Sequence, residues 1–340
     1  MDQKVNRKPT GRTPVIDGLN CAVLTRDQFE RTLDGRVAAI NLTSLRPAND
    51  LAASMGDLAK ALSIAAEHAD LVSIVTSVKE IRQTAAEGKL GIILGTQNST
   101  MVESDAKLLA AMKQLGVRIL QPTYNEENAY GYGAPFEGRA DKGMKEAARE
   151  WIDEMTRLRL IIDLSHCGHR TTSDFLAAAK GPMVVSHANA FAVCPSLRNK
   201  KDEHIRAIAK TGGLIGAVMW SPAVRHDQRP TLDDYLNHVD HLVKVGGIDH
   251  VAFASDITEG AVPSPEKWDK SYGPNGYSRN ITGVLGPWYV FENRLNVDFQ
   301  SLTHAPRIWD GMKKRGYSQT DIDKVRSGNW LRVMQDVWGA

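Results

Sequence analysis

Two histidines that each follow a serine stand at the ends of two strand-like segments. His166 ends the largely apolar segment 160–166, and His187 ends the similar segment 183–187. The helical pattern of residues 171–180 lies between them, so the order predicts a right-handed parallel βαβ unit. Neighbouring parallel strands lie about 4.8 Å apart, and two imidazoles at matching strand ends could therefore reach one metal ion. The alternative is two histidines that only form hydrogen bonds at strand ends.

A carboxylate and an arginine follow in positions that suit the same chemistry. Asp256 ends the apolar segment 251–255, and two imidazoles with one carboxylate form a common catalytic zinc shell. Bound zinc lowers the pKa of its water toward about 7. Asp256 could instead stand free and remove the proton of the attacking water, or serve only as a helix cap or salt-bridge partner. Arg198 could hold a substrate carboxylate or lie on the surface. Further polar residues at expected strand ends are Asn20, Gln97 and Tyr124.

The elements that must position these residues alternate along the chain. Eight strand-like segments are expected at 14–18, 37–42, 90–94, 117–123, 160–164, 183–185, 214–220 and 251–256. Helical patterns such as 26–34 and 75–86 separate most of them, which predicts an α/β fold of the (β/α)8 TIM-barrel type. A long loop is expected at 262–296, over the barrel mouth, and helices end the chain. In that loop, Trp288 and Tyr289 could line the pocket or pin the loop.

The composition sets limits on the class of protein. The 340 residues carry a formal net charge of +2, which gives no field that would attract nucleic acid or an anionic membrane. Three cysteines without a CxxC pair favour a reducing cytoplasm. No apolar run approaches the roughly 20 residues of a membrane span, and no signal-peptide pattern opens the sequence. We expect a flexible basic tail at 1–13 and one barrel domain at 14–340.

Other histidines and cysteines are weaker candidates. His169 is expected at the start of a helix, where a ligand role is the less favoured interpretation. His238 and His241 lie three apart on a predicted helix and suit solvated or inter-helix roles better than metal binding. Cys167 lacks a neighbouring base and is interpreted as a small packed residue.

Several motifs together resemble one family. They are 161–166, 185–187, 194–199, 255–256 and 328–333. In order and spacing they are similar to the membrane (renal-type) dipeptidases of the amidohydrolase superfamily, from about Pro14 to Trp338. The resemblance implies a (β/α)8 barrel with zinc at its mouth that hydrolyses short peptides ending in a free carboxylate.

The resemblance also implies roles for four residues. His166 and His187 match two ligands of the family's second zinc ion, and Asp256 matches the aspartate that handles the proton. Arg198 matches the arginine that receives the substrate carboxylate. The resemblance further allows a homodimer.

The sequence departs from the family at the first metal ion. The family opens with Asp-Gly-His-x-Asp, whereas residues 17–21 read Asp-Gly-Leu-Asn-Cys, so Leu19 replaces the histidine and Cys21 is only a possible substitute ligand. Gln97 stands for the bridging glutamate, and Tyr124 stands for a histidine, although its hydroxyl could donate to a developing oxyanion. Two Zn²⁺ ions held about 3.5–4 Å apart need anionic ligands between them. We therefore expect one divalent metal ion, most simply zinc, or none.

These observations predict a cytoplasmic, dipeptidase-like, metal-dependent hydrolase with at most one metal ion. Its substrate would be a small carboxylate-bearing amide or dipeptide, and no nucleic acid or membrane partner is expected. The expected site comprises His166, His187 and Asp256 as metal ligands, Asp256 and Tyr124 as catalytic residues, and Arg198, Asn20 and Gln97 as substrate-binding residues. The alternatives are a lyase, decarboxylase or isomerase acting on a small acid on the same barrel, and a non-catalytic binding relative.

Overall fold

The computed structural model describes most of the chain. The described residues are 14–47, 49–103, 105–136, 140–272 and 289–339. The predicted basic tail 1–13 and Trp288 lie outside the described residues, as does part of the predicted loop 262–296. Every structural statement below concerns the described residues.

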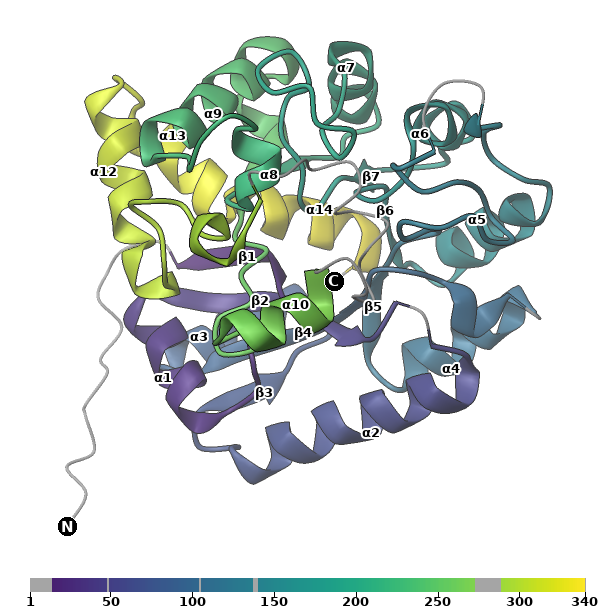
Figure 1. Ribbon diagram of the computed structural model, residues 1–340. Helices are drawn as coiled ribbons and strands as arrows, with labels where there is room; N and C mark the ends of the chain where they lie inside the picture. The colour runs from purple at the N-terminus through teal and green to yellow at the C-terminus, as the bar shows by residue number, and fades with distance from the viewer. Residues whose placement is uncertain (1–13, 48, 104, 137–139, 273–288, 340) are drawn as a thin grey trace.

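All eight predicted strand segments are present. They are β1 (Val15–Asn20), β2 (Val37–Leu45), β4 (Leu90–Thr96), β5 (Val117–Leu120), β6 (Ile161–Asp163), β7 (Met183–Val184), β8 (Ile215–Val218) and β9 (Val251–Ala254). One parallel sheet has the order β1-β2-β4-β5-β6-β7, and β8 pairs with β9. Single parallel bridges join Val185 to Ile215 and Asn20 to Ile257, which closes the ring. The predicted α/β barrel is confirmed (Figure 1).

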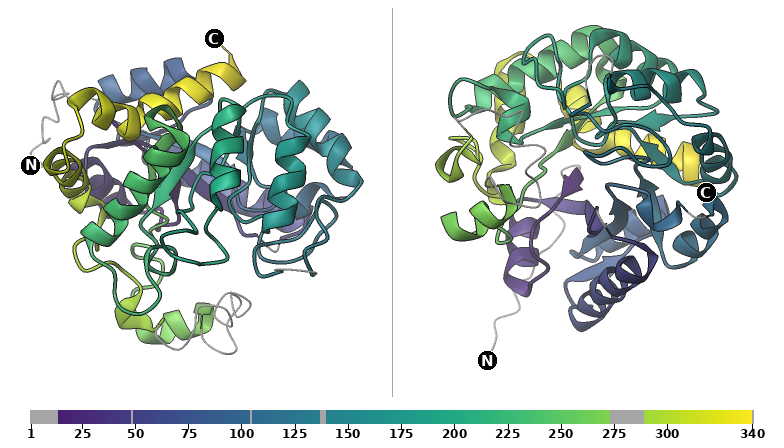
Figure 2. Two further views of the ribbon diagram at one scale, coloured as in Figure 1. Left: turned by 90° about the horizontal axis from the view of Figure 1, so that it is seen from above. Right: turned by 45° about the vertical axis from the view of Figure 1, so that its right-hand side comes forward.

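The barrel interior is filled by one apolar layer and sealed at one end by a helix. The layer includes Ile16, Ala39, Ile93, Ile119, Ile161, Val184, Leu214 and Ala252. Trp330 of α14 (Asn329–Trp338) belongs to the same cluster. A side chain at Gly18 would lie 3.1 Å from the Trp330 ring and 2.7 Å from the Ser186 carbonyl, so only glycine fits this close approach. Figure 2 shows α14 and α10 (Pro265–Tyr272) at opposite ends of the barrel.

Helices surround the sheet, as the alternating pattern predicted. The main ones are α1 (Arg26–Asp34), α2 (Leu51–Glu67), α3 (Val78–Ala86), α4 (Leu109–Gln114), α5 (Ala147–Arg157), α6 (His169–Ala177), α7 (Asp202–Lys210), α9 (Leu232–Gly246) and α12 (Pro306–Lys314). Several begin where a side-chain oxygen accepts from a backbone N–H of the first turn, as Thr25 does for α1 and Thr231 for α9. The Thr25 cap explains why α1 begins at Arg26, where the sequence pattern predicted the helix 26–34 to begin.

Three segments differ from the sequence-based expectation. The short strand β3 (Val72–Ile74) was not predicted; it pairs with β4, and Ser77 caps α3, so the helix expected from residue 75 begins at Val78. The segment after β9 was expected to be a loop, but it contains α10 (Pro265–Tyr272) and a 3-10 turn. Among the helices that end the chain, a π-helical turn, Lys324–Gly328, lies between α13 (Gln319–Asp323) and α14.

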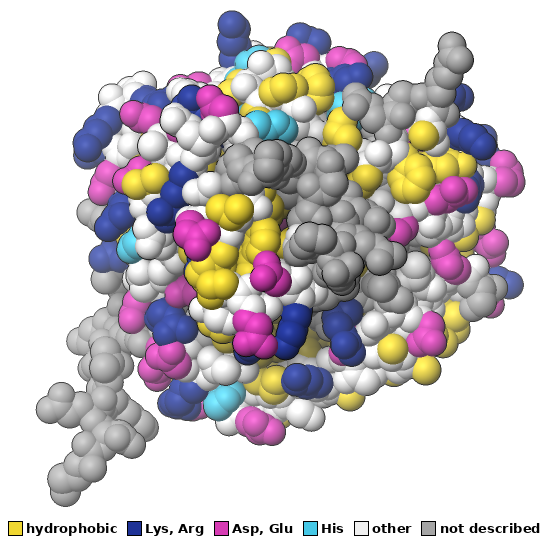
Figure 3. Space-filling model, viewed as in Figure 1, with side chains coloured by type: hydrophobic (Ala, Val, Ile, Leu, Met, Phe, Trp, Pro, Cys, Tyr) yellow, Lys and Arg dark blue, Asp and Glu magenta, His cyan; other side chains and the backbone are white. Residues whose placement is uncertain are grey.

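The surface and the helices carry two further findings. No described helix has the length and apolar character needed to cross a membrane. On the face shown in Figure 3, the Lys and Arg side chains are interspersed with Asp and Glu.

Candidate active site

The two strand-end histidines meet at the barrel mouth. In the register of β6 and β7, Asp163 is paired with Val184. His166 lies three residues after Asp163, and His187 lies three residues after Val184, so the two histidines stand at the same level. Their Nε2 atoms lie 3.0 Å apart, and the ring centroids are 5.0 Å apart with a 57° tilt between the rings. Both side chains are buried. The predicted convergence of the two imidazoles is therefore present.

Neighbouring groups fix the orientation of the His166 ring. Its Nδ1 lies 2.8 Å from Oδ1 of Asn125, and a carbonyl oxygen can only accept, so this nitrogen carries the N–H. The ring also stacks on Tyr124, with centroids 4.2 Å apart. The Nε2 atom of neutral His166 is consequently left with its lone pair facing His187.

A serine fixes the proton of His187 in the same way. Its Nδ1 lies 2.7 Å from Oγ of Ser186, and that hydroxyl donates to Oδ2 of Asp163 over 2.5 Å. Because the hydroxyl proton is directed to the carboxylate, the Ser186 oxygen accepts from Nδ1–H of His187. The Nε2 lone pair of His187 therefore faces His166.

The buried carboxylate of Asp163 accepts several hydrogen bonds from the residues beside both histidines. It accepts from Nε2 of Gln121 over 2.7 Å, from Oγ of Ser165 over 2.5 Å and from the backbone N–H groups of Ser165 and Ser186. A buried carboxylate is tolerated when its oxygens are hydrogen-bonded in this way. Asp163 thus ties the ends of β6 and β7 together and holds both Ser-His pairs in register.

Electrostatics keep both imidazoles neutral. Burial, together with the positive charge of Arg198, lowers the pKa of His166 and of His187 well below the usual value. Two neutral rings with N–H at Nδ1 leave two lone pairs directed at each other. A cation between them would replace this repulsion with two attractive contacts.

Asp256 does not join the two imidazoles, contrary to the predicted three-ligand shell. The described residues contain no group of three or more His, Cys, Asp or Glu side chains placed to hold a metal ion. Asp256 has a left-handed backbone, with φ of 48°, and its N–H donates to the Leu19 carbonyl. This turn directs its Oδ1 toward the thiol of Cys21, 3.6 Å away. Burial raises the pKa of Asp256 to about 7.

Hydrogen bonds occupy the region where the resemblance implies a first metal ion. Nε2 of Gln97 donates to Oγ1 of Thr43 over 2.7 Å and lies 3.5 Å from Sγ of Cys21. Burial and the nearby Asp256 raise the pKa of the Cys21 thiol well above its usual value, so it stays protonated. Leu19 is buried. These neutral groups satisfy one another, and the contact of Gln97 with substrate stays a prediction.

Both the nitrogen and the oxygen of the Asn20 side-chain amide form hydrogen bonds. Its Nδ2 donates to Asp17 over 3.0 Å, and its Oδ1 accepts from the backbone N–H of Ala22 over 3.0 Å. Asn20 therefore shapes the end of β1, and its predicted contact with substrate stays a prediction.

Arg198 and Tyr124 lie on the Asp256 side of the site. Arg198 is buried and donates to the Ser165 carbonyl, and burial lowers its pKa while Asp256 and Tyr124 oppose that shift. Burial and the nearby Asp256 raise the pKa of Tyr124, so its hydroxyl keeps its proton and can donate. One cation and one hydroxyl donor thus lie near the carboxylate of Asp256, and their predicted roles toward substrate stay predictions.

Aromatic side chains enclose a small cavity at Asp256. Its volume is about 20 Å³, and its walls include Trp220, Trp268, Tyr272 and Tyr289. Nε1 of Trp220 donates to the hydroxyl of Tyr289 over 3.2 Å, which holds the segment after residue 288 against the barrel. The volume accommodates about one water molecule.

Comparison with known proteins decides the family. The sequence model of the membrane dipeptidase family, peptidase family M19, matches residues 18–272. The chain belongs to this family. A solved amidohydrolase from Pseudomonas aeruginosa is 29% identical and superposes with a TM-score of 0.87, covering 96% of this chain and 97% of that one.

Two curated proteins are also similar to this chain. A Klebsiella pneumoniae protein, described as uncharacterized and encoded in the pqqA 5′ region, is 27% identical over 281 residues, which is 80% of this chain and 92% of that protein. An uncharacterized dipeptidase of Schizosaccharomyces pombe is 33% identical over 174 residues, which is 50% of this chain and 42% of that dipeptidase. Membership makes this chain a hydrolase of the M19 family.

The M19 family implies a zinc ion, and the residues of this chain fit it in part. The 3.0 Å between the two Nε2 atoms is less than twice a Zn–N bond of about 2.0–2.1 Å. Both rings also have the outer hydrogen bond that orients metal-binding histidines. The imidazole pair therefore suits one divalent ion. The described residues supply no third protein ligand of the usual kinds beside it.

The weaker candidates have structural partners in this family member. His169 begins α6, as predicted, and the buried His238 lies 2.9 Å from the Val224 carbonyl. His241 pairs with Asp202 over 2.8 Å, which agrees with the inter-helix interpretation. Cys167 is buried, and all three cysteines are free.

Sequence reasoning missed three residues of the site. Asp163 stands within an apolar strand, and a charged residue there is a signal of a buried hydrogen-bonded network. Asn125 and Thr43 carry no such signal, because their roles depend on neighbours distant in sequence.

Proposed function

We propose that this M19 family member hydrolyses an amide bond in a small substrate that carries a free carboxylate, such as a dipeptide. We further propose that it uses at most one divalent metal ion, most simply zinc, held by His166 and His187. The observation that supports this most is the 3.0 Å convergence of two neutral imidazoles whose N–H groups are both directed away from each other. Three free cysteines suit a cytoplasmic location.

The side chains around the histidine pair supply the remaining steps. An ion at His166 and His187 would polarise the amide carbonyl or activate water. Ionised Asp256 accepts a proton from the attacking water and later delivers it to the leaving amine. The hydroxyl of Tyr124 donates to the developing oxyanion, and the guanidinium of Arg198 binds the substrate carboxylate.

The pKa of about 7 at Asp256 suits this double role. A general base and acid works best when its pKa lies near the operating pH, because both protonation states are then available. The neutral alternatives, Gln97 and the protonated thiol of Cys21, cannot accept a proton at this pH in the same way.

Elemental analysis and a hydrolysis assay test the proposal together. Protein purified without chelators is expected to contain at most one zinc ion per chain and to release amino acids from some dipeptides or N-acyl amino acids. H166A is expected to lose both zinc and activity, whereas H241A, which removes the inter-helix partner of Asp202, keeps both. Zinc-loaded protein that cleaves none of these amides would contradict the proposed function.

A further inference from the structure

Two aspartates of the barrel are hydrogen-bonded to a serine of a neighbouring strand end in the same way. Asp163 accepts from the backbone N–H and the hydroxyl of Ser186, over 2.9 Å and 2.5 Å. Asp17 of β1 accepts from the backbone N–H and the hydroxyl of Ser255, which directly follows β9, over 2.7 Å and 2.6 Å. Each serine directly precedes a residue of the proposed site, which in the second case is Asp256.

The carboxylate of Asp17 is a fixed acceptor on β1. Its side chain is buried and also accepts from Nδ2 of Asn20 over 3.0 Å and from the backbone N–H of Leu19 over 3.3 Å. A buried carboxylate that accepts from several donors is stabilised in one position, because each displacement would leave a donor unpaired. The Ser255 hydroxyl is therefore bonded to a group that does not move with β9.

Ser255 links this acceptor to the turn at Asp256. Its hydroxyl lies nearer to the Asp17 carboxylate than to the Leu19 carbonyl, which is 3.1 Å away, so the proton is directed to Asp17. The Ser255 oxygen in turn accepts from the backbone N–H of Ile257 over 3.2 Å. The N–H of Asp256 itself donates to the Leu19 carbonyl over 2.9 Å. The backbone on both sides of Asp256 is thus tied to Ser255 or to β1.

The backbone of Asp256 requires such support. Its φ of 48° lies in the left-handed region, which residues other than glycine rarely adopt. The other described non-glycine residues with positive φ are Arg36 and Arg159, and each lies just after the end of a helix, where this conformation is common. Asp256 follows a strand instead. A left-handed residue persists there only when its surroundings hold it, and such residues cluster at active sites.

We propose that Asp17 and Ser255 are positioning residues that hold the carboxylate of Asp256 at the place of proton transfer. The pair fixes the left-handed turn and with it the direction of the carboxylate, whose Oδ1 lies 3.6 Å from Sγ of Cys21. This role rests on the proposed function, in which Asp256 accepts and delivers the proton. Without the Ser255 hydroxyl, the turn loses a bond to β1, and the carboxylate is displaced.

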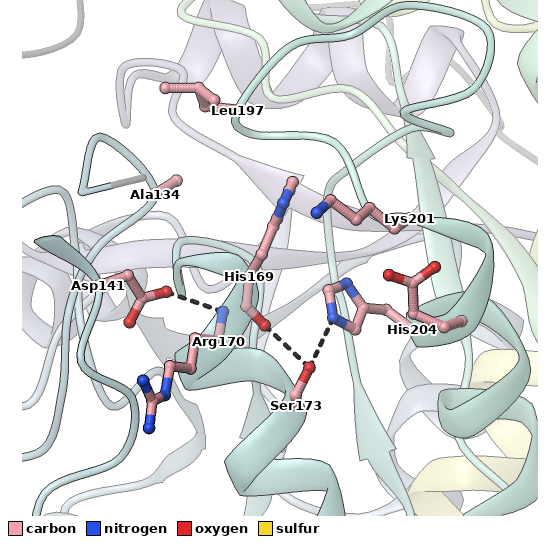
Figure 4. Close-up of a pocket in the computed structure, with 9 residues that line it drawn as sticks. Ala134, Asp141, His169, Arg170, Ser173, Leu197, Lys201 and His204 are labelled. Carbon is pink, nitrogen blue, oxygen red and sulfur yellow. Dashed lines mark hydrogen bonds between the residues drawn. The ribbon is translucent and has the colours of Figure 1, made fainter. Parts of the chain in front are cut away.

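A second hydroxyl and aspartate pair in the chain provides a matched control. The hydroxyl of Thr171 donates to the buried Asp141 over 2.8 Å and accepts from the backbone N–H of Tyr132 over 3.2 Å. The backbone N–H groups of Thr171 and Arg170 also donate to Asp141, and Figure 4 shows the bond from Arg170. These bonds hold the first turn of α6 and involve none of the proposed site residues.

Steady-state kinetics of S255A and T171V test the proposal. S255A is expected to reduce kcat about 10–100-fold, because a displacement of about 1 Å from the productive geometry can cost about 10²-fold. Its KM and zinc content are expected to stay unchanged, because the hydroxyl contacts neither Arg198 nor the histidine pair. T171V, which removes a hydroxyl with the same kind of partners, keeps kcat. S255T, which restores the hydroxyl, is expected to recover most of the loss.

A double substitution shows whether Ser255 acts through Asp256. In the D256N background, S255A is expected to cause no further loss of the residual kcat, because the group that it positions no longer transfers a proton. D17N keeps the shape of the acceptor but not its charge, and it provides the same comparison if S255A does not fold. Full kcat in S255A, or an equal loss in both backgrounds, would overturn the proposal.

Crystal structures of the variants separate this proposal from the proposed function. In S255A, the carboxylate of Asp256 is expected to be displaced by about 1 Å or more, whereas T171V leaves it in place. If the wild type hydrolysed no amide, the proposed function would fail, and a displaced carboxylate in S255A would still support the positioning role. An unchanged Asp256 in S255A would overturn that role, whatever the activity.

Discussion

The hydroxyl of Ser186 donates to the buried carboxylate of Asp163 over 2.5 Å, and this bond decides where the neighbouring histidine carries its proton. Since the hydroxyl proton is committed to Asp163, the oxygen accepts from Nδ1–H of His187. The lone pair at Nε2 is then available to a metal ion. In the Ser186-His187 pair, the serine therefore determines which ring nitrogen of the histidine carries the proton.

Replacing Ser186 by alanine is expected to release the proton of His187 to either nitrogen. Zinc affinity and kcat/KM are expected to fall about 10–100-fold, as for other outer hydrogen bonds of metal ligands. The matched control is S165A, which also removes a hydroxyl donor from Asp163 but no partner of an imidazole. Competition with a zinc chelator and the ¹⁵N shifts of His187 measure the effect. Equal losses in the two variants would show that Ser186 acts only through Asp163.

The pH dependence of hydrolysis is expected to report Asp256. Burial raises the pKa of its carboxyl to about 7, and the proposed base must be ionised. The value of kcat/KM is therefore expected to rise with pH up to about 7 and then to level off. D256N should lose most activity and should not show this rise. A wild-type profile that is flat between pH 5 and pH 8 would rule out Asp256 as the base.

The free energy of unfolding is expected to fall as Asp256 ionises, whereas hydrolysis is expected to rise. The pKa of Asp256 is about 7 in the folded protein against 3.8 ordinarily, so between these values the folded state binds more protons than the unfolded state. Stability contributed by this group is consequently lost as pH rises from about 4 to 7. D256N removes that loss, so its free energy of unfolding relative to wild type should increase from pH 4 to pH 8 in urea titrations. A difference that stays constant with pH would contradict this expectation.

The barrel and the histidine pair could be predicted because local sequence patterns indicate both. Apolar runs ending in Ser-His at equal distances from paired positions place His166 beside His187 once the strands are adjacent. The strand β3 has only three residues and gives almost no periodic signal. It was missed for that reason, as was α10, whose helix lies within a segment rich in turn-forming residues.

The position of the Asp256 carboxylate could not be read from sequence. Its left-handed backbone turns the side chain toward Cys21. The residue types around Asp256 do not indicate that an aspartate will adopt this conformation. The role of Asp163 depends in the same way on a distant residue, since its partner Gln121 directly follows another strand, β5. Strand order and register decide such contacts, and residue types alone do not.

Removing the hydroxyl of Tyr124 is expected to affect the chemical step alone. Y124F keeps the ring stacked on His166, so zinc content and folding should be unchanged. Loss of one donor to a developing oxyanion typically costs about 10²–10³ in kcat with little change in KM. Y124A, which also removes the stack, is expected to lose zinc affinity as well. If Y124F kept full kcat, another group would have to stabilise the oxyanion.

Restoring the family's missing ligands is expected to create a second metal site. Hydrogen bonds among Gln97, Thr43 and Cys21 occupy the region where the resemblance implies the first ion, and none of these groups is anionic. The triple variant L19H/C21D/Q97E supplies an imidazole and two carboxylates, which can offset the repulsion between two dications. Zinc measured by elemental analysis is expected to rise from at most one ion to about two per chain. The control is Q97E alone, which adds one carboxylate without the terminal ligands and should leave zinc content unchanged. Circular dichroism checks that the triple variant is folded. If the folded variant bound no additional zinc, the three replaced ligands alone would not explain the absence of a first metal site.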